Sequence, residues 1–137
     1  MDNMMDSNLL KGTLIETLGI KIVELSKEKV IATMPVCEAT RQPMGMLHGG
    51  ASVALAETVA SVGAYNYIDS KTQAVVGLEI NANHIQGKRD GIVTAIGVPL
   101  HKGQTTMVWD IKISDEEGNL ICVSRCTIAI IAKKAMN

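Results

Sequence analysis

Residues 48–68 have the sequence HGGASVALAETVASVGAYNYI, and this stretch decides the fold. It is rich in alanine and has no internal proline, so it predicts one long helix over about residues 49–65. Apolar side chains occur almost all round this helix, which indicates burial on most sides. The rest of the chain must therefore supply a layer that covers it.

The flanking segments predict that layer. Residues 8–18 predict a helix that stops at Gly19, and residues 20–36 predict a strand hairpin. Four strand segments follow the long helix; the first is TQAVVGLEINANHI and the last is LICVSRCTIAIIA. On the first of them, one face is predicted to carry Val76, Leu78, Ile80, Ala82 and His84. The simplest packing is α+β, with a single helix wrapped by an antiparallel sheet of about six strands.

Composition limits the alternatives. The 137 residues fit one domain, 1–137, and a hydrophobic content of 47% suffices for a core. The net charge of −1 gives no reason to expect a nucleic-acid or membrane partner. Three cysteines (Cys37, Cys122 and Cys126) and the lack of an export signal favour reduced thiols and a cytoplasmic location. An open sheet of this size leaves edges exposed, so we expect pairing with a second copy.

Glu57 is the strongest chemical signal in the residues themselves. It lies in the middle of the apolar helix, where a carboxylate costs several kcal/mol unless it is paired or used. No lysine or arginine of that helix neutralises it, while Ser61 lies one turn further on and is within hydrogen-bonding reach. The alternative is a solvated carboxylate on the edge of the helix.

The second signal is His48-Gly49-Gly50, at the predicted helix start. Free N–H groups there stabilise negative charge, and two glycines let a ligand approach the backbone closely. This arrangement matches an oxyanion hole. A loop-to-helix turn that requires positive φ explains the glycines equally well.

Weaker candidates surround these two signals. Gln42 precedes Pro43 in the loop before the helix, and His84 ends an apolar strand face, where a structural histidine is the commoner explanation. Lys88 and Arg89 could meet phosphate, but a charged turn between strands is the commoner explanation. His101, Lys102 and Gly103 predict a basic strand end, which is ordinarily a solvated turn. Three scattered histidines and no CxxC or HExxH motif predict no metal site, and no nucleotide-binding glycine pattern indicates a cofactor.

Residues 42–50 (QPMGMLHGG), followed by Leu55-Ala56-Glu57-Thr58, resemble the hotdog-fold thioesterases of the PaaI type. Within that family, the chain most resembles the branch that holds the 1,4-dihydroxy-2-naphthoyl-CoA thioesterases and the Arthrobacter-type 4-hydroxybenzoyl-CoA thioesterase. The segments VVGLEINANHI, PLHKG and VWDIKISDEEGNLICVSR also match, so the similarity covers nearly the whole chain after the first dozen residues.

This resemblance implies a hotdog fold that forms homodimers and commonly tetramers, with active sites at the dimer interface. It implies that Gln42, His48 and Gly49 position a thioester carbonyl, and that Glu57 of the partner chain is the nucleophile or general base. Ser61 would orient Glu57 or the water, and His84 would line the acyl pocket. The basic residues would then hold the phosphates of CoA: Lys88, Arg89, His101, Lys102 and, with them, Gly103.

Three functional classes stay open on these grounds. The first is an acyl-CoA thioesterase, whose activated substrate requires only one carboxylate and an oxyanion hole. The second is a hotdog dehydratase or hydratase, which normally relies on a histidine with an acid in a different motif. The third is a non-catalytic acyl-CoA sensor, which would usually carry a separate DNA-binding segment.

Overall fold

The computed structural model describes residues 7–134. Nine helices and strands follow one another in this range: α1 Ser7–Leu10, α2 Leu14–Leu18, β1 Lys21–Leu25, β2 Val30–Pro35, α3 Gly49–Tyr65, β3 Gln73–His84, β4 Ile92–Lys102, β5 Thr106–Ser114 and β6 Leu120–Ala132. The long helix has the predicted bounds.

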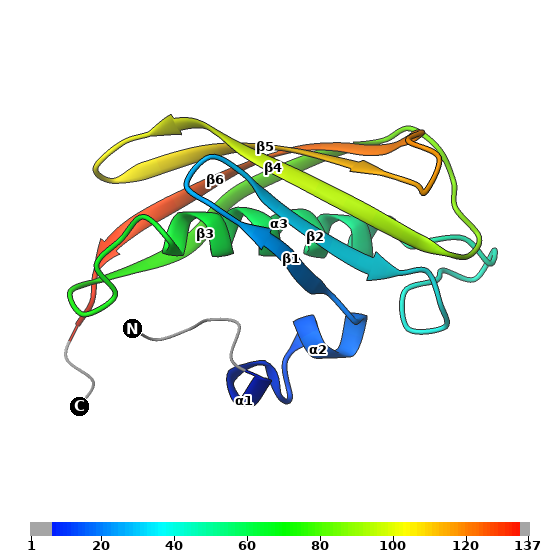
Figure 1. Ribbon diagram of the computed structural model, residues 1–137, viewed down its shortest axis with the longest axis horizontal. Helices are drawn as coiled ribbons and strands as arrows, with labels where there is room; N and C mark the ends of the chain where they lie inside the picture. The colour runs from blue at the N-terminus through cyan, green and yellow to red at the C-terminus, as the bar shows by residue number, and fades with distance from the viewer. Residues whose placement is uncertain (1–6, 135–137) are drawn as a thin grey trace.

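The six strands form a single sheet in the order β1-β2-β4-β5-β6-β3. Every neighbouring pair is antiparallel. Figure 1 shows the sheet curving over α3, which lies lengthwise along its inner face. The predicted architecture of one helix wrapped by a six-stranded antiparallel sheet is confirmed.

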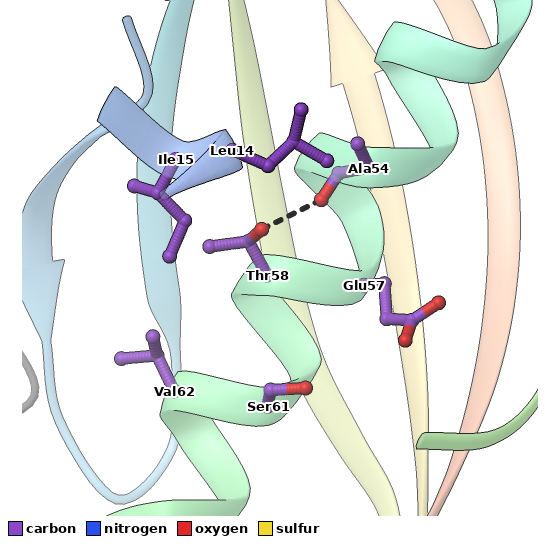
Figure 2. A pocket seen from close by; sticks show the side chains of 7 residues that line it. All are labelled: Leu14, Ile15, Ala54, Glu57, Thr58, Ser61 and Val62. Carbon is purple, nitrogen blue, oxygen red and sulfur yellow. Dashed lines mark hydrogen bonds between the residues drawn. The ribbon is translucent and has the colours of Figure 1, made fainter. Parts of the chain in front are cut away.

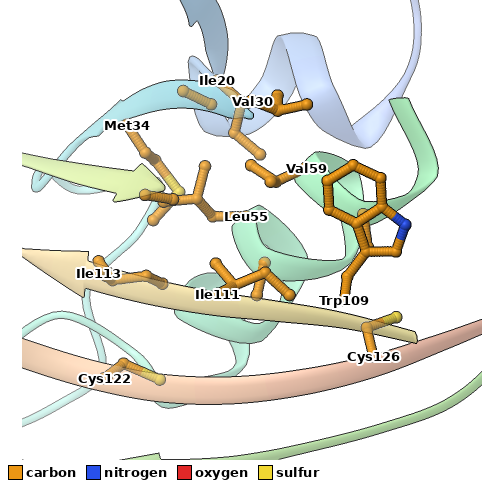
Figure 3. Close-up of a cluster of buried hydrophobic side chains, with 14 of the residues drawn as sticks. Ile20, Val30, Met34, Leu55, Val59, Trp109, Ile111, Ile113, Cys122 and Cys126 are labelled. Atoms are coloured by element: carbon orange, nitrogen blue, oxygen red, sulfur yellow. The ribbon is translucent and has the colours of Figure 1, made fainter. Parts of the chain in front are cut away.

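Small residues let α3 lie close to the sheet. Leu55 and Val59 are fully buried, and each such side chain contributes about 1.5–3 kcal/mol to stability. A methyl group on Gly63 would overlap the ring of Trp109, and one on Gly97 would overlap Val59. Figure 3 shows this contact between helix and sheet. The alanine-rich sequence of the helix is thus matched by glycines at the closest approaches.

The N-terminal segment differs from its prediction. Two short helices, α1 and α2, replace the single helix expected over residues 8–18. The chain turns at Gly12, whose φ is 77°, and Thr13 then caps α2 by accepting a hydrogen bond from the Glu16 N–H. The predicted stop at Gly19 is confirmed, with φ of 71°. The leucine spacing was therefore correct for a helix, but Gly12 interrupts it.

The predicted face of β3 is wrong in its first half. A bulge lies between Gly77 and Glu79, and Leu78 is the extra residue. Before the bulge Val75 packs against the core, and after it Ile80 and Ala82 do. Val76 and Leu78 are instead 44% and 64% exposed. One inserted residue reverses the alternation, which strict period-two counting does not detect.

The strand β3 is also an edge of the sheet. It pairs with β6 over its whole length, and its other side meets no strand within residues 7–134. Cys122 and Cys126 both lie on β6, as predicted, and they and Cys37 are free thiols. No helix in the described range is long and apolar enough to cross a membrane.

Candidate functional site

The start of α3 leaves one backbone N–H without an acceptor. His48 is the N-cap, and its Nδ1 accepts a hydrogen bond of 2.7 Å from the Gly50 N–H. The His48 carbonyl accepts from the next two N–H groups, those of Ala51 and Ser52. Within residues 7–134 the Gly49 N–H has no hydrogen-bond partner. It is therefore the group that remains available for an oxygen atom of a ligand.

His84 lies against Gly49. A Cβ on Gly49 would lie 2.7 Å from His84 Nε2 and 3.0 Å from Cε1, so no side chain fits there without displacing the imidazole ring. His84 is the last residue of β3 and is exposed. The structure thus brings together two residues that the sequence had placed on different elements.

Gln42 is oriented by its own loop. Its Oε1 accepts hydrogen bonds from the N–H groups of Met44, at 2.5 Å, and Met46, at 3.5 Å. The chain turns tightly here through Gly45, whose φ is 86°. Because the oxygen is used, the amide nitrogen of Gln42 is the part of the side chain that is free to donate.

A cavity of about 310 Å³ connects these groups. We call it the helix-start pocket; it is lined by Gln42, Met46, Leu47, Gly49, Ser52, His84, Ile85, Gln86, Gly87 and Ile121. Sequence reasoning named Gln42, Gly49 and His84 and missed the other residues. Ser52 was detectable in principle, since it is a polar residue one turn into an apolar helix, and it is 1% exposed.

Glu57 lies in a different cavity, the Glu57 pocket, of about 290 Å³. Leu14, Ile15, Ala54, Glu57, Thr58, Ser61 and Val62 line it. Figure 2 shows α2 on one side of α3 and the Glu57 carboxylate pointing to the other. Glu57 is half-buried, and within residues 7–134 its carboxylate has no hydrogen-bond or ion-pair partner. The environment of Glu57 is therefore intermediate between the two that the sequence allowed, a buried carboxylate and a solvated one on the edge of the helix.

Ser61 lies beside Glu57 but does not bond to it. Both side chains line the Glu57 pocket and point to the same side of α3 (Figure 2). No hydrogen bond joins them in the described part of the chain, so the predicted contact is not formed there. The hydroxyl that does bond within this helix turn is Thr58, which donates to the Ala54 carbonyl at 2.7 Å.

Cys126, on β6, lies near this carboxylate. Burial, and then the negative charges of Glu57 and Glu79, raise the pKa of the Cys126 thiol to about 12. A thiol with that pKa stays protonated at neutral pH and is a poor nucleophile. Cys126 is therefore not a candidate nucleophile beside Glu57.

The two cavities are separate within one chain. Glu57 follows Gly49 by eight residues, or about 12 Å along the helix axis. Gln42 and Gly49 line the helix-start pocket, whereas Glu57 lines the Glu57 pocket. Within one chain, the Gly49 N–H and the Glu57 carboxylate are therefore not brought into a single cavity.

Lys88 and Arg89 lie next to the loop that carries Gln42. The Lys88 ammonium bonds to Glu116 at 2.6 Å, and this bond lowers the pKa of the Glu116 carboxyl to about 2 and raises that of Lys88. Its backbone carbonyl accepts from the Leu47 N–H. Lys88 therefore already has a structural partner, whereas no carboxylate in residues 7–134 pairs with Arg89.

The second basic segment lies near the opposite end of α3. Lys102 Nζ is 3.4 Å from the hydroxyl of Tyr67, two residues beyond the helix, and 5.0 Å from its ring centre. Lys27 Nζ is 4.6 Å from the same ring centre. Lys102 and Gly103 line a third cavity, of about 480 Å³, and His101 precedes them on β4. Within one chain the structure does not bring these residues together with Gln42, His48 and Gly49.

Comparison with known proteins gives a consistent result. Residues 44–122 match the model of a family described as the thioesterase superfamily. The 1,4-dihydroxy-2-naphthoyl-CoA hydrolase of Listeria monocytogenes is 50% identical, covering 87% of this chain and 96% of the relative. Bacillus subtilis ComA2, whose name describes it as an esterase, is 60% identical over 90% of this chain and 98% of its own.

Solved structures agree with this comparison. The crystal structure of a mutant thioesterase from Pseudomonas aeruginosa superposes with a TM-score of 0.88 and 43% sequence identity. The match covers 90% of this chain and 89% of the other.

Proposed function

Because the chain belongs to the thioesterase superfamily, we propose that it hydrolyses acyl-CoA thioesters to the free acid and CoA. An aryl acyl group such as 1,4-dihydroxy-2-naphthoyl is the preferred candidate, since relatives at 50% and 47% identity are named as hydrolases of that thioester. The observation that carries the proposal is that one helix presents two unused groups: the Gly49 N–H, which has no acceptor, and the Glu57 carboxylate, which has no partner within residues 7–134.

Gly49 and Gln42 provide the electrophilic half of the proposed site. The thioester oxygen accepts from the Gly49 N–H, at the positive end of the α3 dipole, as negative charge develops on it. The Gln42 amide nitrogen is the second donor, because its Oε1 is held by the loop. His48 contributes indirectly, since its Nδ1 caps Gly50 and fixes the backbone next to the donor.

Glu57 provides the other half. Its carboxylate either attacks the carbonyl carbon or removes a proton from the attacking water, and Ser61 assists in orienting that water. We assign Glu57 to the site of the partner protomer. Two features support this assignment: the donors and the carboxylate occupy different cavities of one chain, and β3 has a free edge against which a second copy can pair.

The remaining contacts complete the proposal. His84 lies beside Gly49 and lines the acyl side of the helix-start pocket. Arg89 is the stronger candidate of its pair for a CoA phosphate, because Lys88 is held by Glu116. His101, Lys102 and Gly103 stay candidates only in an assembled dimer or dimer of dimers, where another protomer completes the site. The free thiols fit a cytoplasmic enzyme.

A thiol-release assay tests this function. The protein is incubated with a panel of aryl-CoA and short alkyl-CoA thioesters, and the free CoA thiol is measured continuously. We expect turnover of at least one thioester, with the highest kcat/KM for an aryl group. Binding of acyl-CoA without thiol release would instead identify a non-catalytic sensor, and release of water from a hydroxyacyl thioester would identify a dehydratase.

A further inference from the structure

The carboxylate of Glu57 occupies the space that a side chain at position 77 would take. A Cβ on Gly77 would lie 2.5 Å from Glu57 Oε2 and 3.2 Å from its Cδ. The φ of Gly77 is not positive, so its backbone is compatible with alanine. The reason that a larger residue does not fit at position 77 is therefore the Glu57 carboxylate, not the backbone conformation.

The bulge in β3 makes this contact possible. Gly77 and His84 are seven residues apart, and in a regular strand they would face opposite sides of the sheet. The extra residue, Leu78, reverses the alternation, so that both positions face α3. His84 then lies against Gly49 and Gly77 lies against Glu57. One strand thus contacts both functional positions of the helix.

We propose that Gly77 is a positioning residue for Glu57, and that its missing side chain lets the carboxylate lie against the free edge strand β3. This inference rests on the proposed function, because it assumes that Glu57 carries the chemistry. A methyl group at position 77 would push the carboxylate into another rotamer, and a displacement of about 1 Å at a reacting group can cost about 10²-fold in rate.

Gly77→Ala is the direct test. We expect kcat to fall about tenfold or more with KM within about twofold of wild type, because Glu57 acts on the bound thioester without holding it. Val76→Ala is the matched control on the same edge, since it changes a neighbouring side chain that does not face α3. It should leave kcat within about twofold of wild type. Size-exclusion chromatography of both variants monitors assembly.

Shortening the side chain of residue 57 distinguishes a positioning role of Gly77 from a general effect of Gly77→Ala on β3. Glu57→Asp withdraws the carboxylate by one methylene group, so adding Gly77→Ala to it should cost less than about twofold in kcat relative to Glu57→Asp alone. An equal cost of Gly77→Ala in both backgrounds would overturn the proposal.

Thermal unfolding gives a second measurement that does not depend on activity. Because the backbone of Gly77 suits alanine, Gly77→Ala should raise the Tm in the Glu57→Ala background, and raise it less or not at all when Glu57 is present. Equal Tm changes in the two backgrounds would show that Glu57 and position 77 do not interact.

The two proposals fail in different ways. An active Glu57→Gln enzyme would remove the proposed function, and the positioning role with it. If Glu57→Gln is inactive and Gly77→Ala retains wild-type kcat, only the positioning role is wrong.

Discussion

The start of α3 and its middle hold their candidate functional groups by different means. At the start, Gln42 and His48 are each fixed by hydrogen bonds to backbone atoms within four residues of themselves. In the middle, the Glu57 carboxylate has no hydrogen-bond partner within residues 7–134 and is positioned only by packing, such as its contact with Gly77. The donors are therefore prepared by local chain geometry, whereas the carboxylate depends on packing between distant segments.

This difference has a consequence for assembly. A group fixed by its own loop is already oriented in a single protomer, so the helix-start pocket needs no partner to form. For the Glu57 carboxylate, which has no donor within residues 7–134, we instead expect a substrate or a second chain to complete the site. The following experiments test that division.

The largest effect is expected at Glu57. Glu57→Gln keeps the size of the side chain but removes its charge and basicity, so kcat should fall by at least about 10²-fold. Steady-state kinetics measure this, with circular dichroism to confirm the fold. A variant that keeps more than about a tenth of wild-type kcat would show that the carboxylate is not the attacking or activating group.

A similar loss is expected at the helix start. Gly49→Val should lower kcat/KM by about 10²-fold, because the side chain blocks access to the free N–H. It would also displace His84, so His84→Ala is the matched comparison. We expect Gly49→Val to lose more activity than His84→Ala. Equal losses would place the effect in the imidazole rather than in the N–H.

Mixing two inactive variants tests whether the two halves come from different chains. Glu57→Ala and Gly49→Val are co-expressed, and random pairing makes about half of the dimers mixed. In a shared site, each mixed dimer has one site with both lesions and one with neither, so about a quarter of wild-type activity should return. If tagged chains prove to have mixed and no activity returns, each site is built within one chain.

The smallest effect concerns Lys88 and Glu116. Because the pKa of Glu116 in the folded protein is about 2, below its ordinary value of 4.5, the stability it contributes is present above about pH 4.5 and is lost as the pH falls towards 2. Glu116→Gln should lower the Tm by a few degrees at most at neutral pH, since the Glu116 side chain is 51% exposed. The difference from wild type should shrink on acidification. A constant difference would mean that the ion pair is not its cause.

The sequence predicted most of the fold because α3 carries an unambiguous pattern. Its bounds follow from the glycines at its start and from its alanine-rich composition without an internal proline. The two errors arose where one residue changes the count: Gly12 divides the first helix, and Leu78 reverses the face of β3. The spacing of apolar residues along the sequence shows neither a turn at a single glycine nor a bulge.

The site was predictable in part. Glu57 stood out as a charge among apolar residues, and Gly49 stood out as one of two glycines at a predicted helix start, where backbone N–H groups are free. The contacts of Gly77 and His84 with them could not be found in this way, since they join segments that are distant in the sequence. The partner of Lys88 was missed for the same reason, because Glu116 lies in the turn between β5 and β6.

Trp109 gives the molecule an optical property. It is the only tryptophan of the chain, it is fully buried against Gly63 of α3, and within residues 7–134 its indole nitrogen has no hydrogen-bond partner. An indole ring in such dry surroundings emits at short wavelength, and its emission moves to longer wavelength when water reaches it. The tryptophan emission of this protein, excited where its two tyrosines do not absorb, therefore reports on one event, the separation of the central helix from the sheet.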